Sequence, residues 1–167
     1  MAFLKPRSDK PPGERAFSEE NRTPEERLRA MNSLDHVGIA VRSVASVMPA
    51  YKAIGLRVES VEEVLSEGVR TTFLGGGSHI ELLEALTPES PIASFLEKRG
   101  EGIHHVAVAV WDIDAALDRA RKEGLQVVGK APRPGARGRR VAFFHPNSLH
   151  GVLLEIVESP RAARRPR

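Results

Sequence analysis

The chain has 167 residues, the length of one domain or of two small halves that share a core. Hydrophobic residues make up 41% of it, but no apolar run reaches the roughly 18 residues that a membrane span needs, so we expect no membrane partner. The absence of cysteine excludes disulfides, thiolate metal sites and cysteine nucleophiles. Because the N-terminus lacks the apolar core of a secretory signal, the sequence favours a cytoplasmic location.

The formal net charge of +3 is unevenly distributed along the chain. Residues 159–167 contain several arginines and no acidic residue, whereas residues 34–158 are slightly acidic. A nucleic-acid-binding domain usually carries its positive charge on one face of the fold. We therefore predict no nucleic-acid partner and interpret residues 159–167 as a solvated basic tail.

The N-terminal stretch differs in composition from the rest of the chain. Residues 1–22 are rich in proline, serine and charge and have few apolar residues to bury, so we expect them to be largely disordered. The sequence TPEE, which begins at Thr23, is typical of a helix start and predicts a short helix to about Met31. We therefore predict an extension at 1–33 and a folded domain at 34–158.

The first half of the domain, about 34–86, predicts a strand, a helix and three further strands. The opening strand, Leu34–Val41, reads LDHVGIAV. Ser43 or Ser46 begins the helix, which runs to about Ile54 and ends at a glycine. The three further strands are expected at 56–64, 69–74 and 78–85.

A helical linker at about 88–98 leads into a second half, about 103–158, which repeats the order of elements. Its opening strand, Gly102–Val110, reads GIHHVAVAV. Its helix and its remaining strands are expected at 112–123, 125–129, 139–144 and 151–157.

The two halves align with each other residue by residue. The opening strands place His36 on His105, and the closing strands, HIELLE and GVLLEI, place Glu81 on Glu155. A match that persists along both halves indicates a duplicated unit. Each half therefore contributes one histidine and one glutamate at equivalent positions.

Two imidazoles and two carboxylates form a ligand set suited to a divalent transition-metal ion. Glu81 and Glu155 stand among leucine and isoleucine, where an unpaired carboxylate is rarely buried; a local salt bridge for each is the alternative. Small residues share the expected inward face of each histidine, Gly38 and Ala40 in the first half and alanines in the second. We expect these small residues to leave room for a cavity.

The other histidines have weaker cases for a role in the site. His79 shares the expected face of Glu81, so it is either a pocket residue or a surface residue. His104 is expected to face away from the cleft, because neighbouring strand residues point to opposite sides. His145 and His150 stand in a predicted turn, where a substrate contact and solvent exposure are both open.

Several motifs together resemble a known family. They are LDHVGIAV, SEGVRTTFL, HIELLEAL, ESPIASFLEKRGEGIHHVAVAV, DIDAAL, FFHPNS and GVLLEIVE, and they span about 34–158. The chain thereby resembles the vicinal oxygen chelate (glyoxalase-like) superfamily and, within it, the methylmalonyl-CoA epimerases. The resemblance implies an α+β fold in which two paired βαβββ modules form a curved mixed sheet around a metal cleft, with helices outside. It also implies a homodimer.

The resemblance implies an enzyme that interconverts (R)- and (S)-methylmalonyl-CoA, an acyl-CoA, by removing the C2 proton to give an enolate. The implied cofactor is a divalent metal ion, Co²⁺ first, with Mn²⁺, Ni²⁺, Zn²⁺ or Mg²⁺ as alternatives. Its implied ligands are His36, Glu81, His105 and Glu155. Glu155 and Glu81 are the candidate catalytic residues. The candidate substrate contacts are His79, Thr71, Arg140, His145 and Ser148.

The chain departs from the family pattern at two positions. Some epimerases have a glutamate three residues after a turn glycine, and this chain has Thr71 there, which cannot act as a base at neutral pH. Glu81, Glu67, His79 or a metal-bound water would have to serve as the second base instead. A lysine that is common after a His-Pro pair is Asn147 here. The loop Arg133–Arg140 contains four arginines, which either bind the phosphates of coenzyme A or face solvent.

The same scaffold supports other functions, which the sequence leaves open. A lactoylglutathione lyase would use four similar ligands, whereas an extradiol dioxygenase would use two histidines and one glutamate and would not need Glu81. A thiol transferase that inactivates an antibiotic is a further enzyme of this class. A drug-sequestering protein would lack the metal ligands and line its cleft with aromatic residues, which form only 5% of this chain.

Overall fold

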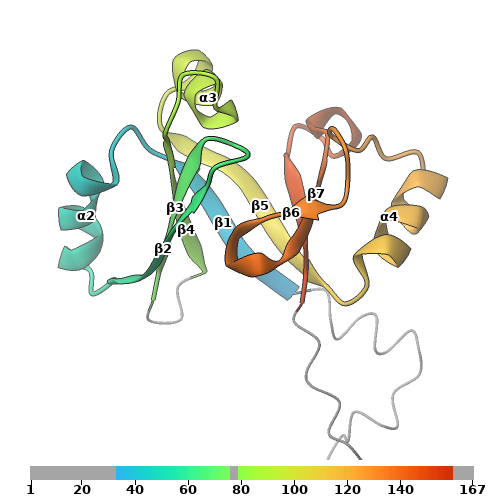
Figure 1. Ribbon diagram of the computed structural model, residues 1–167, viewed down its shortest axis with the longest axis horizontal. Coiled ribbons are helices and arrows are strands. Elements are labelled where there is room, and N and C mark those ends of the chain that lie inside the picture. Colours follow the sequence, from blue (N-terminus) through green and yellow to red (C-terminus); the bar gives the residue numbers. More distant parts are fainter. Residues whose placement is uncertain (1–32, 76–78, 160–167) are drawn as a thin grey trace, which may run out of the picture. The chain divides into compact units, whose positions relative to one another are not determined.

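The computed structural model describes residues 33–75 and 79–159 (Figure 1). The predicted helix from Thr23 to Met31 and most of the predicted basic tail lie outside the described residues, as does most of the glycine turn at 75–77. The predicted domain boundaries stay predictions.

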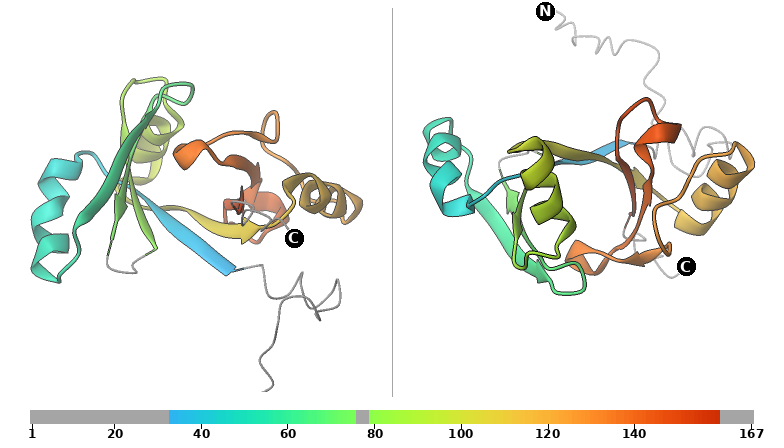
Figure 2. Two further views of the ribbon diagram at one scale, coloured as in Figure 1. Left: turned by 60° about the horizontal axis from the view of Figure 1, so that its bottom comes forward. Right: turned by 90° about the horizontal axis from the view of Figure 1, so that it is seen from above.

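Eight strands form one mixed sheet in the order β2-β3-β4-β1-β5-β8-β7-β6. The strands are β1 (Ser33–Ala40), β2 (Val58–Val64), β3 (Val69–Leu74), β4 (Ile80–Ala85), β5 (Gly102–Val110), β6 (Arg133–Pro134), β7 (Arg140–Phe144) and β8 (Leu154–Glu158). Each half of the sequence supplies four neighbouring strands, and the halves meet where β1 pairs antiparallel with β5. Figure 2 shows that the sheet curls around a central space. The predicted α+β fold of two βαβββ modules is confirmed.

The helices α2 (Val44–Ala53) and α4 (Ile113–Lys122) lie on the outer side of the curled sheet, one on each half (Figures 1 and 2). On α2, Met48 packs with Leu74 and Leu82 of the first half. On α4, Ile113 and Leu117 belong to the matching core of the second half. Because both helices bury one apolar face against the sheet, its opposite side is left for the site.

The duplication also governs how the two outer helices begin. Glu84, at the end of β4, accepts a hydrogen bond from the backbone N–H of Val44 at 2.7 Å. Glu158, at the equivalent end of β8, accepts one from the N–H of Ile113 at 3.5 Å. Each carboxylate satisfies a free N–H at a helix N-terminus, where negative charge is favoured.

The third helix, α3 (Pro91–Arg99), connects the halves, as the sequence predicts. Ser90 caps it and Pro91 occupies its first position, which fits the fixed φ of proline. Ile92 and Leu96 pack with Ala40 and Leu83 and cover one end of the inner side of the sheet. None of the helices within 33–75 and 79–159 has the length and apolar character needed to cross a membrane.

The prediction of a strand at 125–129 is wrong. Val127 makes a single bridge to Phe144, and Gly129 then takes a left-handed φ of 63° that ends the extended run. Beside this bridge, the N–H of Val128 donates to the carbonyl oxygen of Phe143, and the N–H of His145 donates to that of Gln126. The chain pairs with β7 again further on, through the two residues of β6, Arg133 and Pro134. The second module thus keeps the predicted order of elements with a later and shorter strand.

We expect Leu82→Ala to lower the free energy of unfolding by about 2–5 kcal/mol, because it removes a fully buried side chain and leaves a cavity between β4 and α2. Chemical denaturation measures this change. The matched control is Leu65→Ala, whose side chain is 78% exposed and whose loss should change stability by less than about 0.5 kcal/mol. Equal effects of the two substitutions would contradict the packing described here.

Candidate functional site

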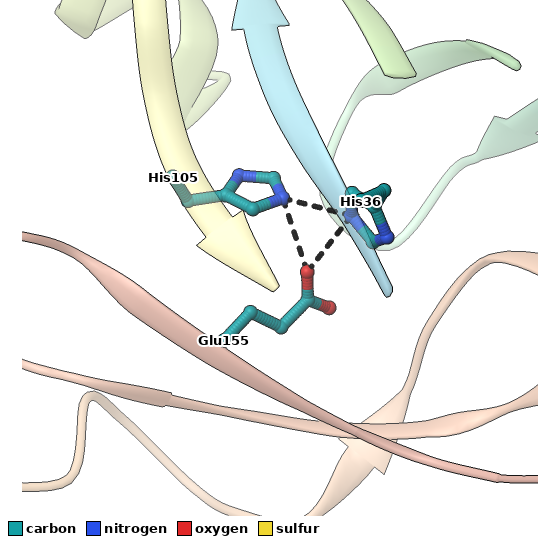
Figure 3. A group of neighbouring side chains, drawn as sticks. All are labelled: His36, His105 and Glu155. Carbon is teal, nitrogen blue, oxygen red and sulfur yellow. Dashed lines mark hydrogen bonds and ion pairs between the residues drawn. The ribbon is translucent and has the colours of Figure 1, made fainter. Parts of the chain in front are cut away.

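Two histidines meet where the halves of the sheet join. His36 on β1 and His105 on β5 are both buried, and their Nε2 atoms lie 3.1 Å apart. Glu155 on β8 reaches the same point, with Oε2 at 3.2 Å from Nε2 of His36 and 3.0 Å from Nε2 of His105. Figure 3 shows the three side chains converging from separate strands.

Glu81 on β4 completes the set of four predicted ligands. Its Oε2 lies 3.1 Å from Nε2 of His36 and 3.6 Å from Nε2 of His105, and its side chain is buried. The sheet register explains why the glutamates arrive together: Glu81 pairs with Gly38 on β1, and Glu155 pairs with Ala107 on β5.

The four side chains fit a divalent metal ion. Metal–ligand bonds to nitrogen and oxygen are about 2.0–2.2 Å long, so neighbouring ligand atoms of one ion lie about 3 Å apart, which is the spacing found here. Within the part of the chain that the structure describes, neither glutamate pairs with an arginine or a lysine. The alternative of a separate salt bridge to a basic side chain is therefore not supported. His36, His105 and Glu155 also offer ligand atoms that all lie within 4.8 Å of one another.

One of the small residues beside the histidines has a different use from the one predicted. Gly38 lies opposite His105 in the pairing of β1 with β5, and a side chain on Gly38 would overlap the imidazole ring of His105. Ala107 lies opposite His36 in the same way. Gly38 thus makes room for the ring of His105 rather than for a ligand.

The electrostatics of the cluster follow from the burial of opposite charges. Burial alone would lower the pKa of His36, but hydrogen bonds to Asp35, Glu155 and Glu81 raise it to about 11. Burial would raise the pKa of Glu155, but its contacts with His105 and His36 lower it to about 2. Glu155 is therefore ionised at neutral pH, which a metal ligand requires.

Each histidine is also held from its other ring nitrogen by the residue that precedes it. Asp35 places Oδ1 at 2.8 Å from Nδ1 of His36. His104 places its Nδ1 at 3.0 Å from Nδ1 of His105, and its ring stands edge-on to Phe95. The expectation that His104 faces away from the cleft is wrong, because its side chain lines the cavity. Burial, together with the charge of His105, lowers the pKa of His104 to about 4, so its ring is neutral.

A cavity of about 290 Å³ lies against the cluster. All four predicted ligands line it, and so does Thr71, whose buried hydroxyl has no hydrogen-bond partner in the described structure. Much of the remaining wall is apolar and comes from both halves: Val64, Val69, Leu83, Ile92, Val141 and Leu153. Such a wall suits a small organic group held close to the ligand atoms.

The segment Arg133–Arg140, which contains β6 and leads into β7, lines the cavity on one side, and two of its arginines contact the first half. Arg133 pairs with Glu67 at 3.2 Å. The backbone N–H of Arg137 donates to Glu62 at 2.7 Å, and its guanidinium lies 3.8 Å from the centre of the Phe73 ring. These arginines line the cavity, so they do not simply face solvent.

The other predicted substrate contacts lie away from the cavity wall. His79 is exposed and bonds the carbonyl oxygen of Asp35 at 2.8 Å. Arg140 pairs with Asp114 on the outer surface. His145 accepts a hydrogen bond from the N–H of Asn147, and Ser148 accepts one from the N–H of Gln126. Of the five candidates only Thr71 lines the cavity, and the roles of the other four stay predictions.

Sequence reasoning did not assign roles to Asp35, Phe73 and Phe143. Phe73 stands edge-on to His36, and Phe143 stands edge-on to His105. The repeat offered a signal for the two phenylalanines, because they occupy equivalent positions in the two halves. In the sheet Phe73 pairs with Glu81, and Phe143 pairs with Glu155. Asp35 also stands at the position equivalent to His104, directly before a predicted ligand.

Comparisons with known proteins agree with this geometry. The profile of the Glyoxalase/Bleomycin resistance protein/Dioxygenase superfamily matches residues 35–143. An ethylmalonyl-CoA/methylmalonyl-CoA epimerase of Cereibacter sphaeroides is 39% identical over 75% of this chain and 96% of its own. A mitochondrial methylmalonyl-CoA epimerase of Dictyostelium discoideum is 37% identical over 77% of this chain and 79% of its own. The structure of a Streptomyces coelicolor methylmalonyl-CoA epimerase variant in complex with 2-nitronate-propionyl-CoA superposes with a TM-score of 0.72, at 36% identity over 77% of this chain and 98% of that one.

We expect Co²⁺ binding at pH 7.5 to release about one proton from His36, whose pKa of about 11 keeps it protonated until a metal ion displaces the proton. Because this proton competes with the ion, Co²⁺ affinity should rise with pH through the neutral range. Calorimetry in two buffers of different ionisation enthalpy counts the protons. His36→Gln should release about one proton fewer, and equal heats in both buffers for the unaltered protein would refute the expectation.

Proposed function

The chain belongs to the methylmalonyl-CoA epimerases of the Glyoxalase/Bleomycin resistance protein/Dioxygenase superfamily, and on this premise we propose that it interconverts (R)- and (S)-methylmalonyl-CoA. The observation that carries the proposal is the convergence of two histidines and two glutamates beside an apolar cavity. Fold membership alone would not distinguish the chemistries of this superfamily, so the argument rests on the site.

The proposed reaction moves one proton between the two faces of C2. That carbon lies between a thioester and a carboxylate, so loss of its proton gives an enolate that is planar at C2. A divalent ion held by the four side chains would act as a Lewis acid that stabilises the negative charge of this enolate. His36 and His105 would hold the ion through Nε2.

Two carboxylates are available to take and return the proton. In Glu155 and in Glu81, Oε2 faces the histidines, so Oε1 is the oxygen that we assign to proton transfer. In one direction ionised Glu155 takes the C2 proton and becomes the acid, while Glu81, which enters the step protonated, delivers its proton to the opposite face and is left ionised; the reverse reaction exchanges these roles. Glu81 comes from β4 and Glu155 from β8, in different halves of the sheet, which supports an approach from two sides. The buried position of both groups shields the enolate from bulk water.

The surroundings of the cavity also suit an acyl-CoA. Its apolar wall accepts the methyl group, and Thr71 offers a hydroxyl without a partner to a substrate oxygen. Arg133, Arg137 and Arg139 line the cavity, and their guanidinium groups suit an anionic substrate, although Arg133 is already paired with Glu67 and Arg139 with Asp35. Arg140, His79, His145 and Ser148 stay candidates for the more distant parts of coenzyme A.

The alternative functions fit the site less well. An extradiol dioxygenase would leave Glu81 without a role, although this residue lies within 3.1 Å of the ligand nitrogen of His36. A drug-sequestering protein would lack the metal ligands and would line its cleft with aromatic residues. Phe73 and Phe143 do belong to the described cavity wall, but both rings pack edge-on against the candidate ligand histidines. A lactoylglutathione lyase shares the ligand types and is the second candidate to test. The choice of Co²⁺, the homodimer and the cytoplasmic location stay predictions.

Proton exchange at C2 tests the proposed function directly. The protein is stripped of metal, reloaded with Co²⁺ or Mn²⁺ and incubated with methylmalonyl-CoA in D₂O, and NMR follows deuterium at C2. We expect exchange only with the ion, and a loss of about 100-fold or more in His105→Ala and Glu155→Gln, which remove a ligand and a base. Glu97→Gln, on the exposed side of α3, is the matched control and should exchange normally.

Absence of exchange from a folded, metal-loaded protein would refute the epimerase proposal. Glutathione hemithioacetals and catechols would then be tested on the same preparation, followed by ligands that only bind.

Some epimerases have a glutamate at the position of Thr71. A pair of substitutions tests whether Glu81 acts as the base in its place. Thr71 and Glu81 are diagonal neighbours on β3 and β4 and both line the cavity, so a carboxylate at either position reaches the same space. We expect Glu81→Gln to lower kcat by about 100-fold while Co²⁺ affinity falls much less, because an amide oxygen can still bind the ion.

Adding Thr71→Glu to Glu81→Gln should restore at least a tenth of the lost kcat, since it returns a carboxylate to this side of the cavity. Steady-state kinetics measures kcat, and calorimetry measures the affinity for Co²⁺. Full activity of Glu81→Gln alone would show that Glu81 is a ligand and not a base.

A further inference from the structure

Two irregularities interrupt the pairing of β1 with β5, one beside each ligand histidine. Leu34 pairs with Val108 and His36 with Ala107, so Asp35 is an extra residue on β1. The second irregularity mirrors the first. Gly38 pairs with His105 and Ile39 with Ile103, so His104 is an extra residue on β5. Bulges of this kind re-aim side chains and are frequent next to active sites.

The bulges place each extra side chain against the histidine that follows it. In a regular strand, consecutive side chains point to opposite faces and could not meet in this way. Here Oδ1 of Asp35 lies 2.8 Å from Nδ1 of His36, and Nδ1 of His104 lies 3.0 Å from Nδ1 of His105. The duplicated halves thus repeat the position of the contact, although its chemistry changes from a carboxylate to an imidazole.

A contact at Nδ1 determines which nitrogen of an imidazole is free. When Nδ1 carries the proton and donates it, Nε2 keeps its lone pair and can bind a cation. The Nε2 atoms of His36 and His105 are the atoms that face each other and the two glutamates. The orientation of both rings therefore agrees with donation from Nδ1 to the preceding residue.

Asp35 is itself held in place from the second half of the chain. The guanidinium of Arg139 lies 2.7 Å from Oδ2 of Asp35 and also donates to the backbone carbonyl oxygen of Glu158 at 2.9 Å. This pair occupies Oδ2 and leaves Oδ1 for His36. Asp35 and Arg139 are both half-buried, so the pair is partly protected from water.

We propose that Asp35 and His104 are positioning residues of the metal centre, which hold the ligand histidines through Nδ1 and direct Nε2 to the ion. The two act unequally, because the carboxylate of Asp35 is a stronger hydrogen-bond acceptor than the imidazole nitrogen of His104. His36 is then the stronger donor of the two ligands. The inference rests only on the metal-binding part of the proposed function.

Metal binding by paired variants tests the proposal. Asp35→Asn keeps the shape and a hydrogen-bond acceptor but removes the charge, and His104→Phe keeps a ring but removes the acceptor. Asp118→Asn and His150→Asn, at exposed positions, are the matched controls. Calorimetry gives the Co²⁺ dissociation constant, and the visible absorption of bound Co²⁺ reports its coordination.

We expect Asp35→Asn and His104→Phe each to weaken Co²⁺ binding by about 10- to 100-fold and to change the Co²⁺ spectrum, with the larger effect in Asp35→Asn. Arg139→Met should weaken binding by less than Asp35→Asn, because Oδ1 still contacts His36. The controls should bind as the unaltered protein does. A purely structural role would lower Tm and leave the spectrum of the bound ion unchanged, and that result would overturn the proposal.

Ring-proton NMR of the unaltered, Zn²⁺-loaded protein provides a test that does not depend on a variant folding. The proposal requires a proton on Nδ1 of His36 and of His105, and on Nε2 of His104. A proton on Nε2 of either ligand would refute it. Co²⁺ binding without C2 exchange would refute the epimerase function alone, whereas C2 exchange with unchanged Co²⁺ binding in Asp35→Asn would refute this inference alone.

Discussion

The antiparallel pairing of β1 with β5 is the constraint on which the site depends. This pair joins the two halves of the sheet, and its register sets Gly38 opposite His105 and Ala107 opposite His36. Each ring therefore lies over a small residue, and the two Nε2 atoms can approach to 3.1 Å. Because side chains alternate along a strand, a slip of one residue would turn a histidine to the outer face of the sheet. Strand pairing thus assembles the ligand set before any ion binds.

Burial of four ionisable side chains is unfavourable unless each has a partner. In this cluster each imidazole lies within 3.6 Å of both carboxylates, so each buried group has a compensating partner. The same compensation recurs at the edge of the cavity, where Arg133 pairs with Glu67 across the halves. Both networks bridge the two halves of the sequence, so the candidate metal ligands also hold the walls of the cavity together.

The sequence was sufficient for the fold class. It also predicted four side chains that lie together in the structure, because the duplication places one histidine and one glutamate in each half. It was insufficient where the chain leaves regular strand geometry. Alternation predicted that His104 faces outward, but a bulge turns it toward His105, and a bulge leaves no mark in hydrophobic periodicity. The strand predicted at 125–129 is also interrupted by irregular backbone, because Gly129 takes a left-handed φ that ends the extended run. Contacts between the halves, such as that of Arg137 with Glu62, depend on the folded sheet and had no local signal.

The differences between the two halves matter as much as their likeness. Phe73 and Phe143 occupy equivalent places beside the glutamates, but two strand positions earlier Thr71 is matched by Val141. One wall of the cavity is therefore polar where the other is apolar, and both residues line it. In the proposed reaction, proton transfer at two faces requires a pair of bases, which the duplication supplies as Glu81 and Glu155. The proposed substrate has a thioester on one side of C2 and a carboxylate on the other, so an asymmetric cavity would favour one orientation of the bound substrate over its reverse.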